Sequence, residues 1–337
     1  MTTTVSIRPL AASVDELIAG ASSREPMKNA DSKSGAMLER VVIDGESFVL
    51  KHFDIHGDWL LRATGDAGCR TIACWELGLY DAVPDCIDAT VVGAARDPAR
   101  YGAGAVLMRD VGSCLVPEGS SVIDLATHRG FIGHMAEQHA AMWGWRDADG
   151  LIPMTTRYQI LTPRMCELEL ARGAGDDVAP LIAVVFAGWA ELAKVRPHLA
   201  GAVRALADDP WPLVSALAET PATFLQGDWK LGNLGRHADG RTILLDWDRP
   251  GQGPATFDLA WYLGVNCDRL PESKEATIEA YRTRLEECGI ATDEWWDRQL
   301  ALTLLGTYLQ LGWSKTADPD ELAWWDAPCA RALALLG

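Results

Sequence analysis

The first hundred residues alternate between apolar and polar positions, the period-two pattern that is typical of half-buried strands. Asp44-Gly45 lies between two such runs, and this dipeptide is a strong signal for a two-residue hairpin turn. One stretch in this part, Ala67 to Tyr80, has helical spacing and ends just before Val83-Pro84. The pattern therefore predicts a small antiparallel sheet with one helix, with strands over 26–29, 37–43, 47–53, 88–94 and 103–108.

Beyond residue 121 the apolar positions recur with the period of long helices. A helix start is well marked at Asp318-Pro319, where an N-cap residue precedes a proline at the first helical position. Helices are predicted over 123–145, 157–171, 178–199, 213–218, 257–266, 274–288, 293–313 and 319–336. Strands followed by a mainly helical part indicate an α+β fold class.

One strand-loop-strand stretch, residues 224–248, carries the chemistry of the chain. Asp228 and Asn233 have the D-x-x-x-x-N spacing of a kinase catalytic loop, in which the Asp accepts the substrate hydroxyl proton and the Asn holds Mg²⁺. Asp246 ends the apolar return strand and could supply a second carboxylate to the same ion. A single Asp in a glycine-rich turn is more often a turn former, but three such residues around one hydrophobic strand favour a catalytic site.

These residues also carry a resemblance. Four segments resemble the aminoglycoside phosphotransferase and choline kinase family: Gln226-Gly-Asp-x-x-x-x-Asn233, Leu-Leu-Asp-Trp-Asp248, Gly253-Pro254 and Phe257-Asp-Leu-Ala-Trp-Tyr262. The family usually has His before Gly-Asp, whereas this chain has Gln226. The resemblance implies a protein-kinase-like bilobal fold. Residues 1–110 would form a nucleotide-binding lobe, and residues 111–337 a helical lobe with the catalytic loop and acceptor site.

The resemblance implies ATP and Mg²⁺ as cofactors and assigns roles in the second half of the chain. Asp228 would orient the attacking hydroxyl and accept its proton, while Asn233 and Asp246 would hold Mg²⁺. Asp258 resembles the family aspartate that braces the catalytic loop from the next helix. The alternative for Asp258 is an acid at a helix N-terminus, stabilised there by the helix dipole.

In the first half, Lys51 resembles the kinase strand lysine that contacts the non-transferred phosphates. Glu76 could pair with Lys51 from its helix, or it could be a solvated helix-face glutamate. Backbone groups near Met108 and Asp110 would hold the adenine. The polar loop 31–36 could lie over the phosphates or form an ordinary turn, and its candidate contacts are Ser32, Ser34 and Gly35.

The net charge of −17 argues against a general nucleic-acid or anionic-membrane binder and favours a cationic small molecule. Such acidity is equally a common means of keeping a protein soluble. Fourteen tryptophans are present, most of them expected in the core, although some rings could face an amino sugar or a quaternary ammonium. Asp297 and Trp313 are the weak substrate candidates.

The eight scattered cysteines show no metal-ligand spacing and indicate reduced thiols. His134 and His139 lie five residues apart, a spacing that does not favour a shared metal. With no signal-like N-terminus and no apolar run long enough for a bilayer, a cytoplasmic protein without membrane or nucleic-acid partners is expected.

The leading hypothesis is ATP- and Mg²⁺-dependent phosphorylation of a hydroxyl on a small polar molecule, an aminoglycoside or amino sugar. One alternative is a metabolic kinase for choline or a neutral sugar. Another is a non-catalytic nucleotide-binding pseudokinase, which the atypical Gln226 and phosphate loop motivate. The sequence leaves the oligomeric state open.

Overall fold

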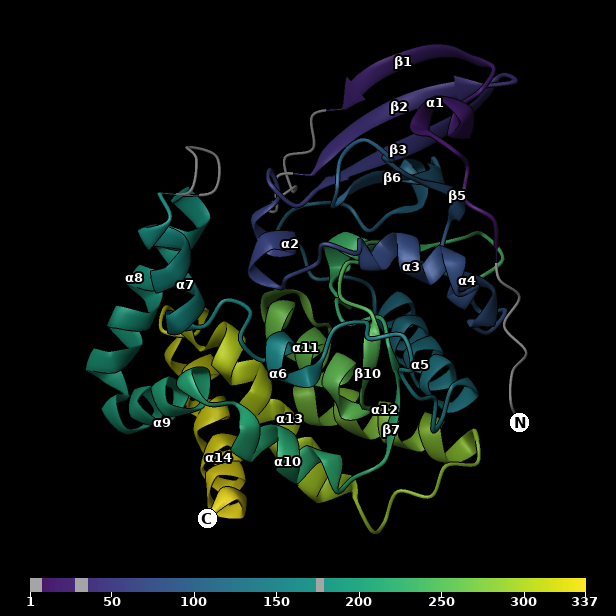
Figure 1. The fold of residues 1–337 in the computed structure, drawn as a ribbon. Helices are drawn as coiled ribbons and strands as arrows, with labels where there is room; N and C mark the ends of the chain where they lie inside the picture. The colour runs from purple at the N-terminus through teal and green to yellow at the C-terminus, as the bar shows by residue number, and fades with distance from the viewer. Residues whose placement is uncertain (1–7, 28–35, 174–178) are drawn as a thin grey trace. The chain divides into compact units, whose positions relative to one another are not determined.

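The computed structural model describes residues 8–27, 36–173 and 179–337 (Figure 1). The chain divides into two compact units, each described below by itself. The first comprises Met1–Glu118 and Leu231–Pro250, and the second comprises Gly119–Lys230 and Gly251–Gly337. The boundary between the units falls within the candidate catalytic stretch. Asp228 belongs to the second unit, whereas Asn233 and Asp246 belong to the first.

A five-stranded antiparallel sheet forms the main part of the first unit. Its strand order is β1-β2-β3-β6-β5. The bounds are β1 Ala21–Met27, β2 Met37–Ile43, β3 Glu46–Asp54, β5 Val91–Arg96 and β6 Ala103–Arg109. Asp44 and Gly45 connect β2 to β3 with φ of 51° and 81°, the two positive values of a type I′ turn. The predicted small antiparallel sheet and its hairpin are therefore confirmed.

Two predicted strands are displaced along the chain. β1 begins at Ala21, earlier than the predicted 26–29, and nearly all of its side chains are exposed. An edge strand of this kind has no buried face and therefore no apolar alternation to detect, and an edge position also tolerates Pro26. β5 begins at Val91 rather than at 88, because Thr90 adopts a left-handed φ of 61° that ends the preceding short strand β4 (Ile87–Asp88).

The helices of the first unit are short: α1 Val14–Leu17, α2 Trp59–Ala63, α3 Arg70–Glu76 and α4 Leu79–Ala82. The single helix predicted over 67–80 is wrong, because Gly78 has φ 65° and separates α3 from α4. Glycine adopts this conformation without the steric cost that other residues meet. Val41, Leu50 and Ala105, from three neighbouring strands, form with Ile18 and Leu107 a buried cluster of the sheet.

A second, three-stranded sheet completes the first unit, in the order β4-β9-β8. β8 (Leu234–Arg236) pairs antiparallel with β9 (Thr242–Leu244), and β4 pairs parallel with β9. Between β4 and β8 the chain forms short 3-10 turns at Gly112–Cys114 (η1) and Leu231–Asn233 (η2). This sheet places the turn before β8 and the end of β9 next to each other, which positions Asn233 and Asp246.

The second unit is mainly helical, as predicted. Its elements are α5 Leu125–Ala141, α6 Met154–Arg157, α7 Pro163–Ala171, α8 Ala179–Val195, α9 Pro197–Asp208, α10 Trp211–Ala218, β7 Ala222–Leu225, β10 Gly251–Pro254, α11 Thr256–Val265, η3 Cys267–Arg269, α12 Lys274–Glu287, α13 Trp296–Leu311, η4 Gly312–Ser314 and α14 Pro319–Leu336. β7 and β10 form a two-stranded antiparallel sheet. α13 is buried along almost its whole length and is the core helix of this unit.

Two predicted helices of this unit have different bounds in the structure. The predicted 178–199 is α8 followed by α9, which starts at Pro197. Of the predicted 157–171, only the part from Pro163 is the helix α7, because α6 ends at Arg157 and 158–162 is not helical. Proline lacks the N–H that a helix interior requires but suits the first helical turn. Both boundaries were therefore readable from the sequence as helix starts.

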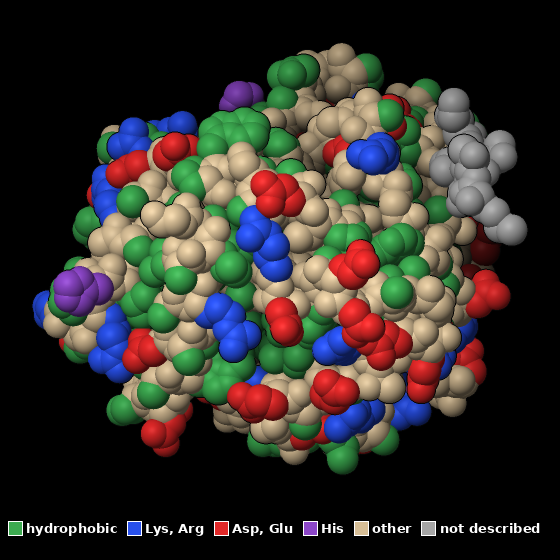
Figure 2. Space-filling view, turned by 90° about the horizontal axis from the view of Figure 1, so that it is seen from below, with side chains coloured by type: hydrophobic (Ala, Val, Ile, Leu, Met, Phe, Trp, Pro, Cys, Tyr) green, Lys and Arg blue, Asp and Glu red, His purple; other side chains and the backbone are tan. Residues whose placement is uncertain are grey.

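No described helix combines the length and the apolar character needed to cross a bilayer. On the face shown in Figure 2, acidic and basic side chains are interspersed rather than gathered into a basic field.

The core of the second unit yields a stability prediction from two helical glycines. A Cβ added at Gly306 on α13 would lie 2.1 Å from the Tyr158 ring, whereas one at Gly201 on α9 would meet nothing within 4 Å. Gly306→Ala is expected to lower the free energy of unfolding by at least about 1–3 kcal/mol through overpacking. Gly201→Ala should raise it by up to about 1 kcal/mol through helix propensity.

Urea unfolding of the native protein and both variants measures these two changes. The same chemical change at both sites makes Gly201→Ala the matched control. Equal effects of the two substitutions would contradict the packing of Tyr158 against α13.

Candidate functional site

Lys51 lies in the middle of β3, between its partner strands β2 and β6. Its Nζ is 2.6 Å from Asp246 Oδ1 and 2.8 Å from Asp248 Oδ2. Burial on its own would lower the pKa of Lys51, but the two carboxylates outweigh it and raise the pKa above the usual value. The lysine is therefore held as a cation in a nearly buried position.

The segment Asp246-Trp247-Asp248 leaves β9 in an unusual backbone conformation. Asp246 has a left-handed φ of 60°, which costs about 1–3 kcal/mol for a residue with a Cβ. Trp247 is fully buried, packs edge-on against Tyr80 at 5.3 Å and donates its indole N–H to Leu244. These contacts hold the segment so that both acidic side chains reach Lys51.

Asp248 is the more buried of the two acids. Burial first and the nearby Asp246 next raise the pKa of Asp248 to about 7, although Lys51 opposes the shift. Its second oxygen accepts a hydrogen bond of 2.8 Å from the Thr71 hydroxyl on α3. Asp248 therefore contacts both the strand lysine and a helix of the same unit.

Asn233 ends the 3-10 turn before β8 and is almost fully buried. Its carbonyl accepts a 2.9 Å hydrogen bond from the N–H of Leu245, the residue that precedes Asp246. The structure thus brings Asn233 and Asp246 to adjacent positions within the first unit. An amide oxygen and a carboxylate are hard ligands that fit Mg²⁺, which leaves its other coordination positions to phosphates and water.

Asp228 lies in the second unit, in the turn after β7, where Gly227 has φ 87°. Asp228 is 5% exposed. One carboxylate oxygen accepts a 2.8 Å hydrogen bond from the Trp261 indole, and the other is 3.1 Å from Lys230 Nζ. The carboxylate is therefore fixed in orientation by one neutral donor and one cation.

Asp258 on α11 is fully buried and holds the backbone of this turn. Its carboxylate accepts hydrogen bonds of 3.2 and 3.0 Å from the N–H groups of Gln226 and Gly227. The ring of His139 lies 3.3 Å from the same carboxylate. Gln226 stands where the family usually has His, and its amide oxygen accepts the N–H of Asp228 at 2.7 Å.

The contacts of Asp258 predict a stability effect. Asp258→Asn would place an amide N–H₂ against the backbone N–H donors and leave one of these buried groups without an acceptor. The free energy of unfolding is expected to fall by about 2–4 kcal/mol. Asp326→Asn is the matched control, because Asp326 forms a half-exposed pair with Arg196 worth at most about 1 kcal/mol. Urea unfolding of both variants measures these changes in the free energy of unfolding. Equal decreases in the two variants would refute the bracing role of Asp258.

The structure describes two of the five remaining residues that were expected to contact the nucleotide. Ser32, Ser34 and Gly35 lie outside the described residues. Met108 pairs with Val49 and Val91 inside the sheet. The carboxylate of Asp110 accepts hydrogen bonds from Arg40, Ser47 and the Gly112 N–H, which fixes the chain after β6.

The expected pairing of Glu76 with Lys51 is not the one observed. Glu76 ends α3 and forms an ion pair with Arg96 of β5, while the carboxylate partners of Lys51 are Asp246 and Asp248. The physical reason is the shortness of α3. The helix stops at Glu76, within reach of Arg96, and its hydrogen bond toward the lysine cluster comes from Thr71 instead.

Asp297 and Trp313, the weak substrate candidates, cannot share one small site. Asp297 is exposed in the first turn of α13, whereas Trp313 follows the last turn. Sixteen intervening steps of about 1.5 Å separate them by roughly 24 Å along the helix. Trp313 packs against Gly188 of α8 and donates its indole N–H to Gln310, which gives it a packing role.

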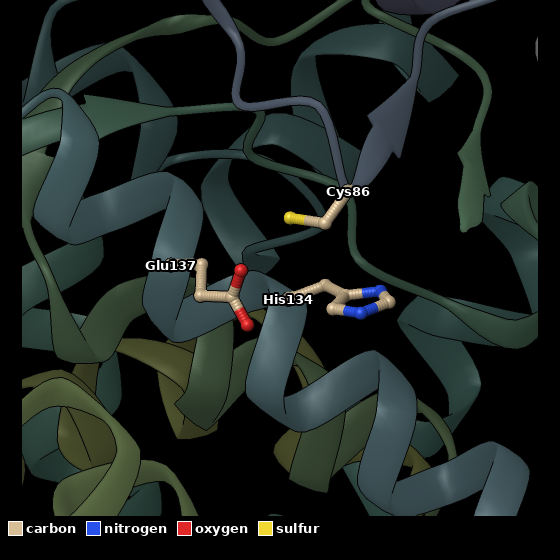
Figure 3. Close-up of side chains that lie close together, drawn as sticks. All are labelled: Cys86, His134 and Glu137. Carbon is tan, nitrogen blue, oxygen red and sulfur yellow. The ribbon is translucent and has the colours of Figure 1, made fainter. Parts of the chain in front are cut away.

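His134 and Glu137 project from neighbouring turns of α5 (Figure 3). Cys86, drawn with them, belongs to the first unit, and no metal site is inferred from the three. The His139 ring instead contacts Tyr281 and Asp258 in the core of the second unit.

A family comparison supports the class of the protein. Residues 164–295 match the phosphotransferase enzyme family (APH). The matched segment contains Asp228, Asn233, Asp246 and Asp258, so the resemblance predicted from residues 226–262 is confirmed, as is an enzyme of the phosphotransferase class. A comparison with curated protein sequences gives no match.

Solved structures of small-molecule kinases are similar over most of their length but at low identity. A choline kinase from Streptococcus pneumoniae is 12% identical, with 96% of this chain and 95% of that chain covered and a TM-score of 0.46. An aminoglycoside phosphotransferase from Alicyclobacillus acidocaldarius is 16% identical, with 98% and 96% covered and a TM-score of 0.46. A spectinomycin phosphotransferase is 13% identical, with 93% and 87% covered and a TM-score of 0.44. At these values the likenesses support no functional conclusion.

Three residues of the candidate site were missed by the sequence interpretation. Lys230 follows Asp228 by two positions, and this short spacing was the available signal. Asp248 was quoted in the Leu-Leu-Asp-Trp-Asp motif without a role. Thr71 gave no sequence signal, because only the fold brings its hydroxyl to Asp248.

Proposed function

We propose that the protein is an ATP- and Mg²⁺-dependent phosphotransferase that phosphorylates a hydroxyl of a small polar molecule, an aminoglycoside or amino sugar. The observation that carries the proposal is the match of residues 164–295 to the phosphotransferase family. Asp228, Asn233 and Asp246 all lie within that segment at the spacing such chemistry requires.

The first unit supplies the groups that handle the nucleotide phosphates. Lys51 contributes a buried, fixed cation to the non-transferred phosphates, and Asn233 and Asp246 contribute the oxygen ligands for Mg²⁺. The ion, when bound, neutralises charge on the phosphate oxygens. Such groups accelerate the reaction because their orientation is set before the nucleotide arrives.

The second unit supplies the group that handles the acceptor. The acceptor hydroxyl forms a bond to the γ-phosphorus as the bond to the β–γ bridging oxygen breaks, and ADP leaves. Asp228 orients the hydroxyl and accepts its proton. Trp261 and Lys230 fix the Asp228 carboxylate at 2.8 and 3.1 Å, and Asp258 fixes the turn that carries it.

The acceptor class follows from charge. The chain has 47 acidic and 30 basic residues, and a negative field raises the local concentration of cationic molecules. Amino sugars and aminoglycosides carry both ammonium groups and hydroxyls, so one molecule would satisfy the charge preference and the chemistry.

Mg²⁺-dependent release of ADP over a panel of aminoglycosides, glucosamine, neutral sugars and choline tests the proposal. Turnover with an aminoglycoside or amino sugar, strongly reduced in Asp228→Asn, is the expected result. Turnover with choline or a neutral sugar alone would overturn the acceptor class. Binding of ATP without turnover on any acceptor would overturn the enzymatic proposal and favour a pseudokinase.

A further inference from the structure

The strand lysine of the first unit has an unusual set of partners. Lys51 Nζ contacts two carboxylates from one short segment, Asp246 at 2.6 Å and Asp248 at 2.8 Å. The acid at the end of α3, Glu76, is engaged by Arg96. A different residue must therefore fix the lysine if Asp246 is to serve a metal.

The two carboxylates differ in burial and in their other contacts. The side chain of Asp246 is 29% exposed, whereas that of Asp248 is 6% exposed. Asp248 also accepts a hydrogen bond of 2.8 Å from Thr71, whose hydroxyl is 2.9 Å from the Trp247 carbonyl as well. Asp248 is thus the enclosed acid and Asp246 the more open one.

Helix α3 is tied to the same point by a second contact. The Tyr80 hydroxyl donates to the Thr71 carbonyl at 2.8 Å, and the Tyr80 ring packs on Trp247. Thr71, Trp247 and Asp248 are therefore fixed to one another in the core of the first unit. A carboxylate held in this way can orient a lysine, because its own position is set by packing.

We propose that Asp248 is the positioning residue for Lys51, anchored to α3 by the Thr71 hydroxyl, in the place that Glu76 was expected to take. Asp246 is then able to ligate Mg²⁺ while Lys51 keeps one carboxylate partner. For its effect on nucleotide binding, this inference rests on the proposed function.

The rate at which an amine-reactive ester labels Lys51 tests the role of Asp248 without requiring enzymatic turnover. Labelling is followed by mass spectrometry on the full-length protein in EDTA. Asp248→Asn is expected to label about tenfold faster than the native protein, because one charge-assisted hydrogen bond to the ammonium is weakened. Glu76→Gln and Asp54→Asn, a change on the same strand β3, should label at the native rate. Native-rate labelling of Asp248→Asn, or equal acceleration by Glu76→Gln, would overturn the proposal.

A second pair of variants separates positioning from stability. Thr71→Val removes the hydroxyl and keeps the shape, so it should accelerate labelling, and Thr71→Ser should restore the native rate. Acceleration by both, or by neither, would refute the link to α3.

Nucleotide titrations with and without Mg²⁺ then distinguish the two acids. Asp248→Asn should keep the Mg²⁺ dependence of ATP binding, and its loss would make Asp248 a metal ligand rather than an anchor. If the native protein itself shows no Mg²⁺-dependent binding, the proposed function fails, and the labelling experiment still decides the anchor.

Discussion

Replacing Asp228 by Asn is expected to lower turnover by about 10²–10⁴-fold, the range for removal of a positioned general base. The amide keeps the shape of the carboxylate and can still accept the Trp261 indole N–H. It cannot accept the proton of the acceptor hydroxyl or pair with Lys230 as an anion. Steady-state ADP release at saturating acceptor measures the change.

Nucleotide binding provides the internal check on this variant. Asp228 lies in the second unit, whereas Lys51, Asn233 and Asp246 lie in the first. ATP affinity in the presence of Mg²⁺ should therefore remain near the native value. Asp239→Asn, an exposed change in the turn after β8, is the matched control and should retain native turnover. Near-native turnover of Asp228→Asn would refute the assignment of the base.

The candidate catalytic stretch could be grouped from sequence because its signals are local. Asp228 and Asn233 are five residues apart, and Asp246 ends the next apolar strand, so no knowledge of the fold was needed to group them. Lys51 became a candidate in the same way, from its position on a strand after a well-marked hairpin. The contacts made by Asp258 are likewise those expected of a bracing residue.

The lysine partner was not predictable, because it depends on where α3 ends. Sequence spacing favoured one helix over 67–80 with Glu76 in its middle, and the observed helix stops at Glu76 itself before Gly78 turns the chain. As a result, α3 contacts the lysine cluster through the Thr71 hydroxyl and not through Glu76. The buried carboxylate partner of Lys51 is Asp248. Long-range contacts of this kind leave no periodic signal.

Gln226 shows how a departure from a family pattern can be absorbed locally. Its side chain is fully buried and its amide oxygen accepts the Asp228 N–H, while Asp258 accepts the N–H groups of Gln226 and Gly227. The turn therefore has its backbone donors satisfied without a histidine. This argues that the atypical residue leaves the turn intact, and it weakens the motive for the pseudokinase alternative.

Replacing Asp246 by Ala is expected to lower ATP affinity in the presence of Mg²⁺ by at least about 100-fold. Mutation of a residue that only supports a metal ligand already lowers metal affinity by about 10–100-fold, and loss of a ligand itself should have a larger effect. Isothermal titration with ATP in Mg²⁺ and in EDTA measures both parts. In EDTA the variant should bind ATP at least as tightly as the native protein, because a carboxylate near the phosphates repels them when no cation is present.

The two titrations together separate a metal ligand from a structural acid. Loss of a merely structural residue would weaken binding equally in Mg²⁺ and in EDTA, whereas loss of a ligand weakens binding only in Mg²⁺. Asp248→Asn serves as the matched comparison, since it removes the other acid of the Lys51 cluster and should retain the Mg²⁺ effect. An Asp246→Ala protein with native Mg²⁺ dependence would show that Asp246 does not hold the ion.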